Sequence, residues 1–418
     1  MSLLSRPAAA VRAATSGLPR PFWFLWTGVL VTRMGAFVLP YLALYLTQGL
    51  RLSAARAGLV LALYGAGGAV AAPLGGFLAD RVGRRAVMVT ALGLGGAGMI
   101  ALGLAHRLEV IAPAIFLVAL LSEAYRPAMQ AAVGDLIPAT DRVRAFGLIY
   151  WVINVGFAVG LTLGGLLASR SFLWLFIGDG ATTIAFAAII WAGVPETRPT
   201  PAARAPHAPR PHPLAGFLVP YRDRRFVAFL GLSFLFALVF MQGFGALSLD
   251  MVAHGVSRAS FGRILAVNAV LIIVVQPFLG PALARFNRSG TLATGAVLAG
   301  LGFGLNALAR TPPAYVAGVA VWTIGEMLVL PVAGALVADL APADVRGRYQ
   351  GAYALAFGLA VCAAPALGMS ALGRFGSVAM WSGCLAIGLI VAAGHVALRP
   401  ALTALRRTRL AAGATPAG

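Results

Sequence analysis

The chain has 418 residues, of which 60% are hydrophobic and only 11% carry a charge, so it has too little polar material to cover a water-soluble globule of this length. The formal net charge is +20, but the basic residues fall between apolar runs instead of forming one stripe, which argues against a nucleic-acid partner. All 32 basic residues are Arg, and because a nucleotide-binding P-loop needs a Lys to reach the phosphates, an ATP-driven pump with its own nucleotide site is excluded as well.

Twelve apolar stretches are long enough to cross a bilayer, which takes about 20 residues in a helix. The first is too long for the apolar core of a cleaved signal sequence, about 7 to 15 residues, so we expect it to be retained as helix 1. The sequence therefore predicts an all-α membrane protein with twelve transmembrane helices. We expect them near residues 22–48, 57–79, 87–105, 110–134, 146–168, 171–194, 225–249, 259–283, 291–309, 314–338, 349–370 and 375–398.

The connections between these stretches are short except at residues 195–224, which are rich in Pro and Arg. This composition predicts an extended linker between an N-terminal six-helix bundle, residues 1–194, and a C-terminal six-helix bundle, residues 225–398. Arg residues concentrate in alternate loops, and Arg-rich loops stay in the cytoplasm. Both termini, the linker and the tail at residues 399–418 are therefore predicted to be cytoplasmic, in a multi-pass protein of the cell (inner) membrane.

An internal repeat relates the two halves at a constant offset of 204 residues. Because corresponding Arg-rich loops must face the same side, each repeat needs an even number of helices, and six fits the count. Parallel repeats of six helices place a substrate cavity at their interface, near the middle of the membrane. The superimposed pairs are Gly76 and Gly280, Arg81 and Arg285, Arg84 and Arg288, Pro127 and Pro331, Asp135 and Asp339, Pro138 and Pro342, Arg142 and Arg346, Arg144 and Arg348, and Gly147 and Gly351.

Three motifs resemble signatures of a known transporter family. The stretch GFLADRVGRR at residues 76–85 resembles the major facilitator superfamily signature G-x-x-x-D-R-x-G-R-R between helices 2 and 3. The sequence PETR at residues 195–198 resembles the short motif that follows helix 6 in this superfamily. In helix 5, the residues Gly156, Gly160, Leu161, Gly164 and Gly165 resemble the motif G-x-x-x-G-P-x-x-G-G of drug:proton antiporters. Leu161 stands where the family has Pro. The resemblance implies two six-helix bundles that expose a central site alternately to either side of the membrane.

The loop between helices 2 and 3 also has a physical interpretation of its own. Gly83 accepts a positive φ where the chain must turn within a few residues, and Asp80 can pair with an Arg or with the positive N-terminal end of a helix. The alternative is a charged turn that only anchors the topology. The second repeat has Ala284 at the position of the acid, so only the first can latch in this way. We interpret the loop as a cytoplasmic gate made of Asp80, Arg81, Gly83, Arg84 and Arg85.

The glycines of helix 5 lie four residues apart and form a flat groove that lets another helix approach closely. Static packing explains this groove equally well. The resemblance implies a role in sealing or bending at the interface of the halves. Leu161 leaves the backbone hydrogen bonds of the helix intact, so the proline kink of the family motif is not expected here.

Ionisable residues near the centres of the predicted helices are the leading candidates for proton coupling, because a charge at bilayer depth is costly and usually lines a cavity. They are Arg33 in helix 1, Glu123 and Arg126 in helix 4, Asp179 in helix 6 and Glu326 in helix 10. Helices 1, 4, 7 and 10 line the cavity in the superfamily. The resemblance therefore implies one chamber shared by Arg33, Glu123, Arg126 and Glu326.

Two interpretations of these charges stay open. Arg33 or Arg126 can neutralise Glu123 in a permanent ion pair that orders the bundle. Alternatively, Glu123 or Glu326 takes up and releases a proton as its surroundings change during transport. Glu326 is the clearer candidate for a proton carrier because no Arg is close to it in the sequence. Asp179 is the weaker one, since helix 6 more often supports the cavity than lines it.

Aromatic and amide side chains at the same depth are candidate substrate contacts, although core packing explains any one of them equally well. They are Tyr41, Trp151, Asn154, Phe240, Phe244 and Trp322. A mostly apolar wall favours hydrophobic or amphipathic substrates, and hence proton-coupled efflux of the multidrug type. Proton-coupled uptake or facilitated transport of a small polar metabolite is an alternative, and a membrane scaffold without transport activity is another.

The expected partners follow from this interpretation. They are a small-molecule substrate, protons and the lipid bilayer, without a nucleic acid or a nucleotide, and we expect a monomer. No cofactor and no enzymatic activity are expected, because no catalytic constellation is present. His207 and His212 flank prolines in the linker, and we interpret them as solvated residues instead of a metal site.

Overall fold

The computed structural model describes residues 15–38, 41–42, 45–52, 54–199, 217–244, 246–283 and 285–414. Most of these residues are helical, and none of them lies in a β-strand. Ten helices in this part of the chain are long and apolar enough to cross a membrane. One of them, Ala343–Arg409, runs through two of the predicted transmembrane helices. The predicted all-α membrane fold is confirmed.

In the N-terminal half, five long helices follow a shorter first one. A helix of 20 residues is about 30 Å long, the thickness of a bilayer's hydrocarbon core. The long helices reach or exceed this length because their apolar runs are interrupted only at loops. The elements are α2 (Arg20–Met34), the π-helical turn η1 (Tyr45–Gly49), α4 (Ala54–Arg81), α5 (Arg84–Gly103), α6 (Leu108–Leu136), α7 (Arg142–Arg170) and α8 (Phe172–Gly193).

The C-terminal half repeats this plan. Its last element turns back on itself at Gly376, whose φ of +78° is easily adopted only by glycine, so α15 contains both helix 11 and helix 12. The elements are α9 (Val219–Arg222), α10 (Arg224–Phe240), η3 (Met241–Phe244), α11 (Ala246–Ala253), α12 (Arg258–Leu283), α13 (Arg288–Gly304), η4 (Leu305–Ala307), α14 (Pro312–Leu340), η5 (Ala343–Val345) and α15 (Arg346–Ala414).

Helices 1 and 7 differ from the expected continuous spans. Helix 1 was predicted near residues 22–48, but α2 ends at Met34 and the chain leaves the helical path at Gly35. Helix 7 was predicted near residues 225–249, and it is divided between α10, η3 and α11. Hydropathy measures only how long an apolar run is, so it cannot detect a break in the backbone of that run.

The end of the chain also differs from the prediction. Helix 12 was expected to stop at residue 398 and to be followed by a tail, but α15 continues to Ala414. Leu402 in this extension is buried, and Arg406 pairs with Asp339 at the end of α14. The extension is therefore packed against the C-terminal half.

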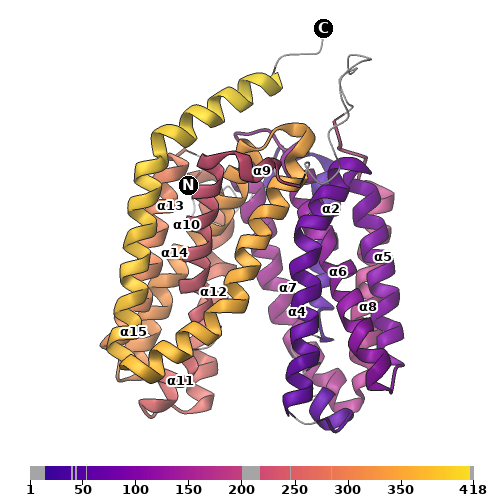
Figure 1. Ribbon diagram of the computed structural model, residues 1–418, viewed down its shortest axis with the longest axis vertical. Coiled ribbons are helices and arrows are strands. Elements are labelled where there is room, and N and C mark those ends of the chain that lie inside the picture. Colours follow the sequence, from indigo (N-terminus) through magenta and orange to yellow (C-terminus); the bar gives the residue numbers. More distant parts are fainter. Residues whose placement is uncertain are drawn as a thin grey trace, which may run out of the picture.

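The two halves meet most extensively along two pairs of helices, α4 with α15 and α7 with α12, and also where α7 meets α14 and α6 meets α15. They lie closest together near the end of the molecule where α2 begins and α15 ends, which we call the termini end, and they diverge toward the opposite end (Figure 1). At the termini end the backbones of α4 and α15 nearly touch, since a Cβ on Gly351 would lie 2.5 Å from the carbonyl oxygen of Ala72. Glycine at Gly351 is therefore required for this approach.

Candidate functional site

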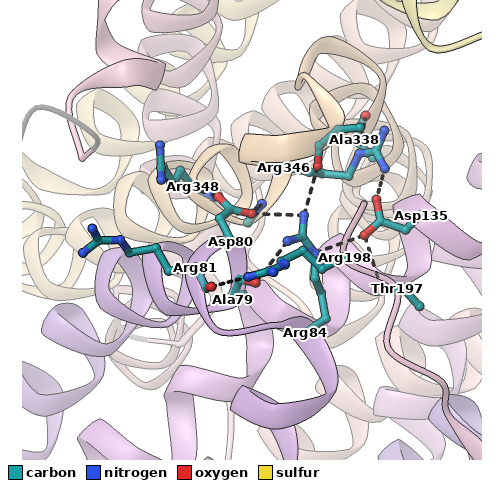
Figure 2. Close-up of polar contacts among 12 residues, drawn as sticks. Ala79, Asp80, Arg81, Arg84, Asp135, Thr197, Arg198, Ala338, Arg346 and Arg348 are labelled. Atoms are coloured by element: carbon teal, nitrogen blue, oxygen red, sulfur yellow. Dashed lines mark hydrogen bonds and ion pairs between the residues drawn. The ribbon is translucent and has the colours of Figure 1, made fainter. Parts of the chain in front are cut away.

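At the termini end, Asp80 of α4 crosses the boundary between the halves and binds the first turn of α15. Its Oδ1 accepts a hydrogen bond of 2.9 Å from the backbone N–H of Gly347, and its Oδ2 accepts one of 2.9 Å from that of Arg348. The Arg84 guanidinium lies 3.1 Å from Asp80 Oδ1 (Figure 2). Asp80 thus pairs with an Arg and with a helix N-terminus at the same time, and we call these contacts the latch.

Arg84 extends the latch into a wider network. Its side chain is fully buried, and its Nε donates to Asp135 Oδ2 at 3.1 Å. Asp135 in turn pairs with Arg346 of the other half (Figure 2). Arg84 Nη2 also donates to the carbonyl oxygen of Ala343 at 3.0 Å. A buried Arg is stable only when its donors are satisfied, and here carboxylates and carbonyl groups from both halves satisfy them.

A second network stands at the repeat-related position. Asp339, which corresponds to Asp135 in the repeat, lies 2.6 Å from Arg142 Nη1, 2.9 Å from Arg288 Nη2 and 2.7 Å from Arg406 Nε. Arg142 and Arg288 correspond to Arg346 and Arg84. Arg406 comes from the extension of α15. Ala284, the residue that replaces the acid of the first repeat, lies outside the described residues.

The sequence-based choice of site residues included Asp80 and Arg84 of the first network. It missed Asp135 and the whole network around Asp339, although the repeat itself contained the signal. Asp135 and Asp339 are the paired acids of the two repeats, each matched with an Arg pair at the same offset of 204 residues. A charge that recurs in both halves of a membrane protein requires a partner in each half. Which Asp meets which Arg depends on the packing of the halves, so the sequence does not show it.

The loop between α4 and α5 is held by Glu196 of the PETR motif. Glu196 Oε1 accepts from the backbone N–H of Arg84 at 2.8 Å, and Oε2 accepts from that of Arg85 at 3.2 Å, so Glu196 caps α5. Gly83 has a φ of +131°, and a Cβ there would collide with the Glu196 carboxylate. The Arg198 side chain donates to the Arg81 carbonyl group. The first residues of the predicted linker are therefore bound to the loop, while residues 200–216 lie outside the described residues.

Glu326 occupies the boundary of the halves, near the middle of α14. It is 4% exposed, and its Oε1 accepts a hydrogen bond of 2.6 Å from the Tyr150 hydroxyl of α7, in the N-terminal half. Its Oε2 accepts one of 2.8 Å from the Asn268 amide of α12, which also donates to Thr323. Within the described residues no Arg or His forms an ion pair with Glu326, so neutral donors alone hold this carboxyl group.

The other candidates for proton coupling lie in a cavity of about 80 Å³ in the N-terminal half. Glu123 Oε2 lies 2.7 Å from Arg126 Nε, and both side chains are partly exposed. Glu326 is not among the residues that line this cavity, so the structure does not bring together the four residues expected to share one chamber. The lining of this N-half cavity includes Arg33, Tyr64, Glu123, Tyr125, Arg126 and Asp179.

Asp179 also has a structural role at the break in helix 1. Its Oδ2 accepts a hydrogen bond of 3.1 Å from the backbone N–H of Val38, four residues after α2 ends. The break exposes backbone donors that a continuous helix would satisfy, and a carboxylate from α8 supplies the missing acceptor.

The glycines of helix 5, which is α7, pack on helix 1 of the same half, which consists of α2 and the residues that follow its break. A Cβ on Gly156 would lie 2.5 Å from Arg33 Cβ, one on Gly160 would lie 2.8 Å from the Arg33 carbonyl oxygen, and one on Gly164 would lie 2.8 Å from the Tyr41 ring. These glycines therefore make room for helix 1, both before and after its break. They do not face the opposite half. The surroundings of Gly165 lie outside the described residues.

The aromatic candidates mostly make packing contacts. Trp322 is 2% exposed and stacks on Phe303 with ring centroids 5.2 Å apart, and Phe240 packs edge-on against it at 6.0 Å. Trp151 stacks on Trp26 and donates to the Ile273 carbonyl oxygen across the boundary at 2.8 Å. Asn154 donates to the Tyr150 carbonyl oxygen at 2.9 Å. The side chain of Phe244 lies outside the described residues.

Comparison with known proteins places this architecture in a family. The sequence profile of the Major Facilitator Superfamily matches residues 25–251 and 243–416. The uncharacterized MFS-type transporter YttB of Bacillus subtilis (strain 168) is 28% identical over 341 residues, which cover 80% of this chain and 84% of that protein. The Na(+), Li(+), K(+)/H(+) antiporter of Planococcus maritimus is 23% identical over 362 residues, 78% of this chain and 84% of that protein.

A solved structure supports the same fold. The human organic anion transporter MFSD10 (TETRAN) superimposes with a TM-score of 0.71 over 90% of this chain and 99% of that chain, at 18% sequence identity. At this identity the likeness concerns the arrangement of the helices alone.

Proposed function

The chain belongs to the Major Facilitator Superfamily of membrane transporters, and from this premise we propose that it exports small hydrophobic or amphipathic compounds in exchange for protons. In this proposal the two halves rock about a central site and expose it to either side in turn. A proton that enters the cell across about 100 mV releases about 2.3 kcal/mol, which drives the substrate outward.

One observation carries the coupling to protons: Glu326 is a buried carboxyl group, bound by one donor from each half and by no cation within the described residues. Such a group is costly to bury as an anion, so it favours a proton while it is enclosed. Movement of the halves separates Tyr150 on α7 from Glu326 on α14 and lets water reach the carboxyl group. Proton uptake and release are thereby coupled to the alternation of states.

The latch supports the conformational part of the proposal. It joins α4 to the first turn of α15 only when the halves are closed at the termini end, so a rocking motion must break it. We propose that this end faces the cytoplasm, in the cell membrane, because the Arg-rich segments gather there. We also propose that residues 195–224 connect the two bundles as a cytoplasmic linker and that the chain works as a monomer.

The direction of transport rests on two further points. The glycines of helix 5 resemble the antiporter motif, and the relative from Planococcus maritimus is named an antiporter for H(+). The polar lining of the N-half cavity favours a second candidate function, proton-coupled uptake or facilitated transport of a small polar metabolite. Export by antiport moves protons opposite to the substrate, whereas proton-coupled uptake moves them with the substrate and facilitated transport moves none.

Everted membrane vesicles test the proposal, because their interior becomes acidic during respiration and a pH-sensitive dye reports the gradient. An exported compound should collapse the gradient in vesicles with the wild-type chain and not in vesicles with Glu326→Gln. Glu109→Gln, at an exposed position in the first turn of α6, is the matched control and should behave like the wild type. A broad panel of amphipathic compounds with no effect on the gradient would reject antiport.

A further inference from the structure

Arg33 is a positively charged side chain at membrane depth that lacks a direct counter-ion. Its guanidinium group makes one long contact, 3.5 Å from Nη2 to the Tyr125 hydroxyl, and its Nε is buried without a hydrogen-bond partner. Within the described residues no carboxylate lies within ion-pair distance of Arg33. An Arg inside the membrane is costly unless its charge is paired. The Arg33 guanidinium has more donors than its one contact uses, so these donors are available to a ligand.

The remaining charges of the N-half cavity are already engaged. Glu123 and Arg126 neutralise each other at 2.7 Å. Asp179 is buried, and its Oδ2 accepts a hydrogen bond of 3.1 Å from the backbone N–H of Val38. Asp179 forms no ion pair among the described residues either, but its carboxylate is buried and bound by a backbone donor, whereas Arg33 is partly exposed and keeps unused donors. The accessible unpaired charge in this cavity is therefore that of Arg33. A cationic ligand would have to break the Glu123–Arg126 pair or compete with the Val38 N–H for the buried Asp179 carboxylate, whereas an anionic ligand meets Arg33 without displacing any ion pair.

We propose that the N-half cavity binds the anionic group, a carboxylate or sulfonate, of an amphipathic substrate, with Arg33 as its counter-ion. This inference rests on the proposed transport function and names its substrate class. The guanidinium plane offers several donors that match a carboxylate, and the Tyr125 hydroxyl lies next to them. Leu92, Met99 and the Tyr64 ring line the same cavity and supply an apolar wall for the body of the ligand.

The proposal has a consequence for the driving force. An anion that leaves the cell while one proton enters moves two positive charges inward, whereas a cation exchanged for one proton moves none. Export of an organic anion by this chain therefore depends on the membrane potential as well as on the pH gradient. Export of an isosteric cation would depend on the pH gradient alone.

A pair of probes that share a ring system but differ in charge tests the proposal. The purified full-length chain in detergent is titrated by calorimetry with 1-naphthoate and with 1-naphthylmethylammonium. We expect the naphthoate to bind roughly 10- to 100-fold more tightly, the range of one charge-assisted hydrogen-bonded contact. Equal affinities of the wild-type chain for the two probes, or tighter binding of the ammonium probe, would overturn the proposal, so this test needs no variant.

Variants assign the preference to Arg33. Arg33→Gln should weaken naphthoate binding roughly 10-fold or more, and Arg33→Lys, which keeps the charge, should recover part of it. Arg107→Gln, at an exposed position before α6, is the control and should bind like the wild type. A folded Arg33→Gln chain, judged by its thermal unfolding, with wild-type affinity for naphthoate would overturn the assignment.

The binding test is independent of the coupling test. Glu326→Gln should bind naphthoate like the wild type while losing exchange with protons. Naphthoate binding together with no collapse of the pH gradient in vesicles would reject the proposed function and keep the anion site. Collapse of the gradient by cations, without naphthoate binding, would reject the anion site and keep the proposed function.

Discussion

Asp80→Asn is the substitution that isolates the latch, because Asn has nearly the same shape as Asp but no charge. In the structure the Asp80 side chain is completely buried and accepts two backbone hydrogen bonds of 2.9 Å from the first turn of α15. An Asn keeps one carbonyl oxygen and places an amide NH₂ where the second acceptor was. That amide faces the N–H of Arg348 or of Gly347, so one donor loses its partner.

The magnitude follows from these contacts. A hydrogen bond to a charged group contributes about 1.5–3 kcal/mol, and a negative charge at a helix N-terminus adds about 0.3–1 kcal/mol. Since one neutral hydrogen bond survives, the closed termini end should lose about 2–4 kcal/mol relative to the open one. At about 1.4 kcal/mol per tenfold, the ratio of closed to open molecules should fall roughly 30- to 700-fold.

Spin-label distances measure this ratio directly. Val82 and Phe286 are exposed in the two loops at the termini end, one in each half, and accept cysteine labels after Cys362 and Cys384 are replaced. We expect Asp80→Asn to add a population with a longer distance between the labels while the amount of inserted protein stays the same.

The matched control is Asp344→Asn, which makes the same chemical change at an exposed position of the same end. It should leave the distance distribution unchanged. An unchanged distribution in Asp80→Asn, together with normal transport kinetics, would refute the reasoning, because the carboxylate would then contribute nothing to closure.

Two further predictions concern the same end of the molecule. Gly83→Ala should lower the unfolding free energy by about 1–3 kcal/mol, because φ is +131° there and the new Cβ meets the Glu196 carboxylate. Gly93→Ala, at a helical site with open space around it, is the control and should not lower it. Equal melting temperatures of the two variants would contradict the strain assigned to Gly83. Asp339→Asn should lower the unfolding free energy by about 3–5 kcal/mol, since it leaves buried Arg partners without a counter-charge. Arg406→Gln should lower it by about 1 kcal/mol or less, because the Arg406 side chain is 33% exposed. Denaturation curves that rank these two variants in the reverse order would count against the network.

The sequence predicted the fold well because the bilayer sets a length that apolar runs must reach. It also predicted that Glu326 lies in the middle of helix 10 without an Arg close by in the sequence. It did not predict Tyr150 as a partner of Glu326, since these residues are 176 positions apart and meet only when the halves pack. Backbone breaks escaped the prediction for a different reason, because the residues after Gly35 stay as apolar as a continuous helix.

The family resemblance implies one chamber shared by Arg33, Glu123, Arg126 and Glu326, but the structure divides these residues between two places. Arg33, Glu123 and Arg126 line the N-half cavity, while Glu326 lies between α14, α7 and α12. Whether a residue faces its own bundle or the boundary depends on the rotation of each helix. Helices of nearly uniform hydrophobicity leave that rotation undetermined in the sequence.

The most direct test of the account is a comparison of two transport modes in proteoliposomes that contain the purified chain with Glu326→Gln. Exchange of labelled for unlabelled 1-naphthoate needs only alternation of the halves, whereas accumulation against a gradient needs the proton. We predict that Glu326→Gln keeps the exchange and loses proton-driven accumulation, while Glu109→Gln keeps both. Proton-driven accumulation at the wild-type rate in Glu326→Gln would contradict the role assigned to this carboxyl group.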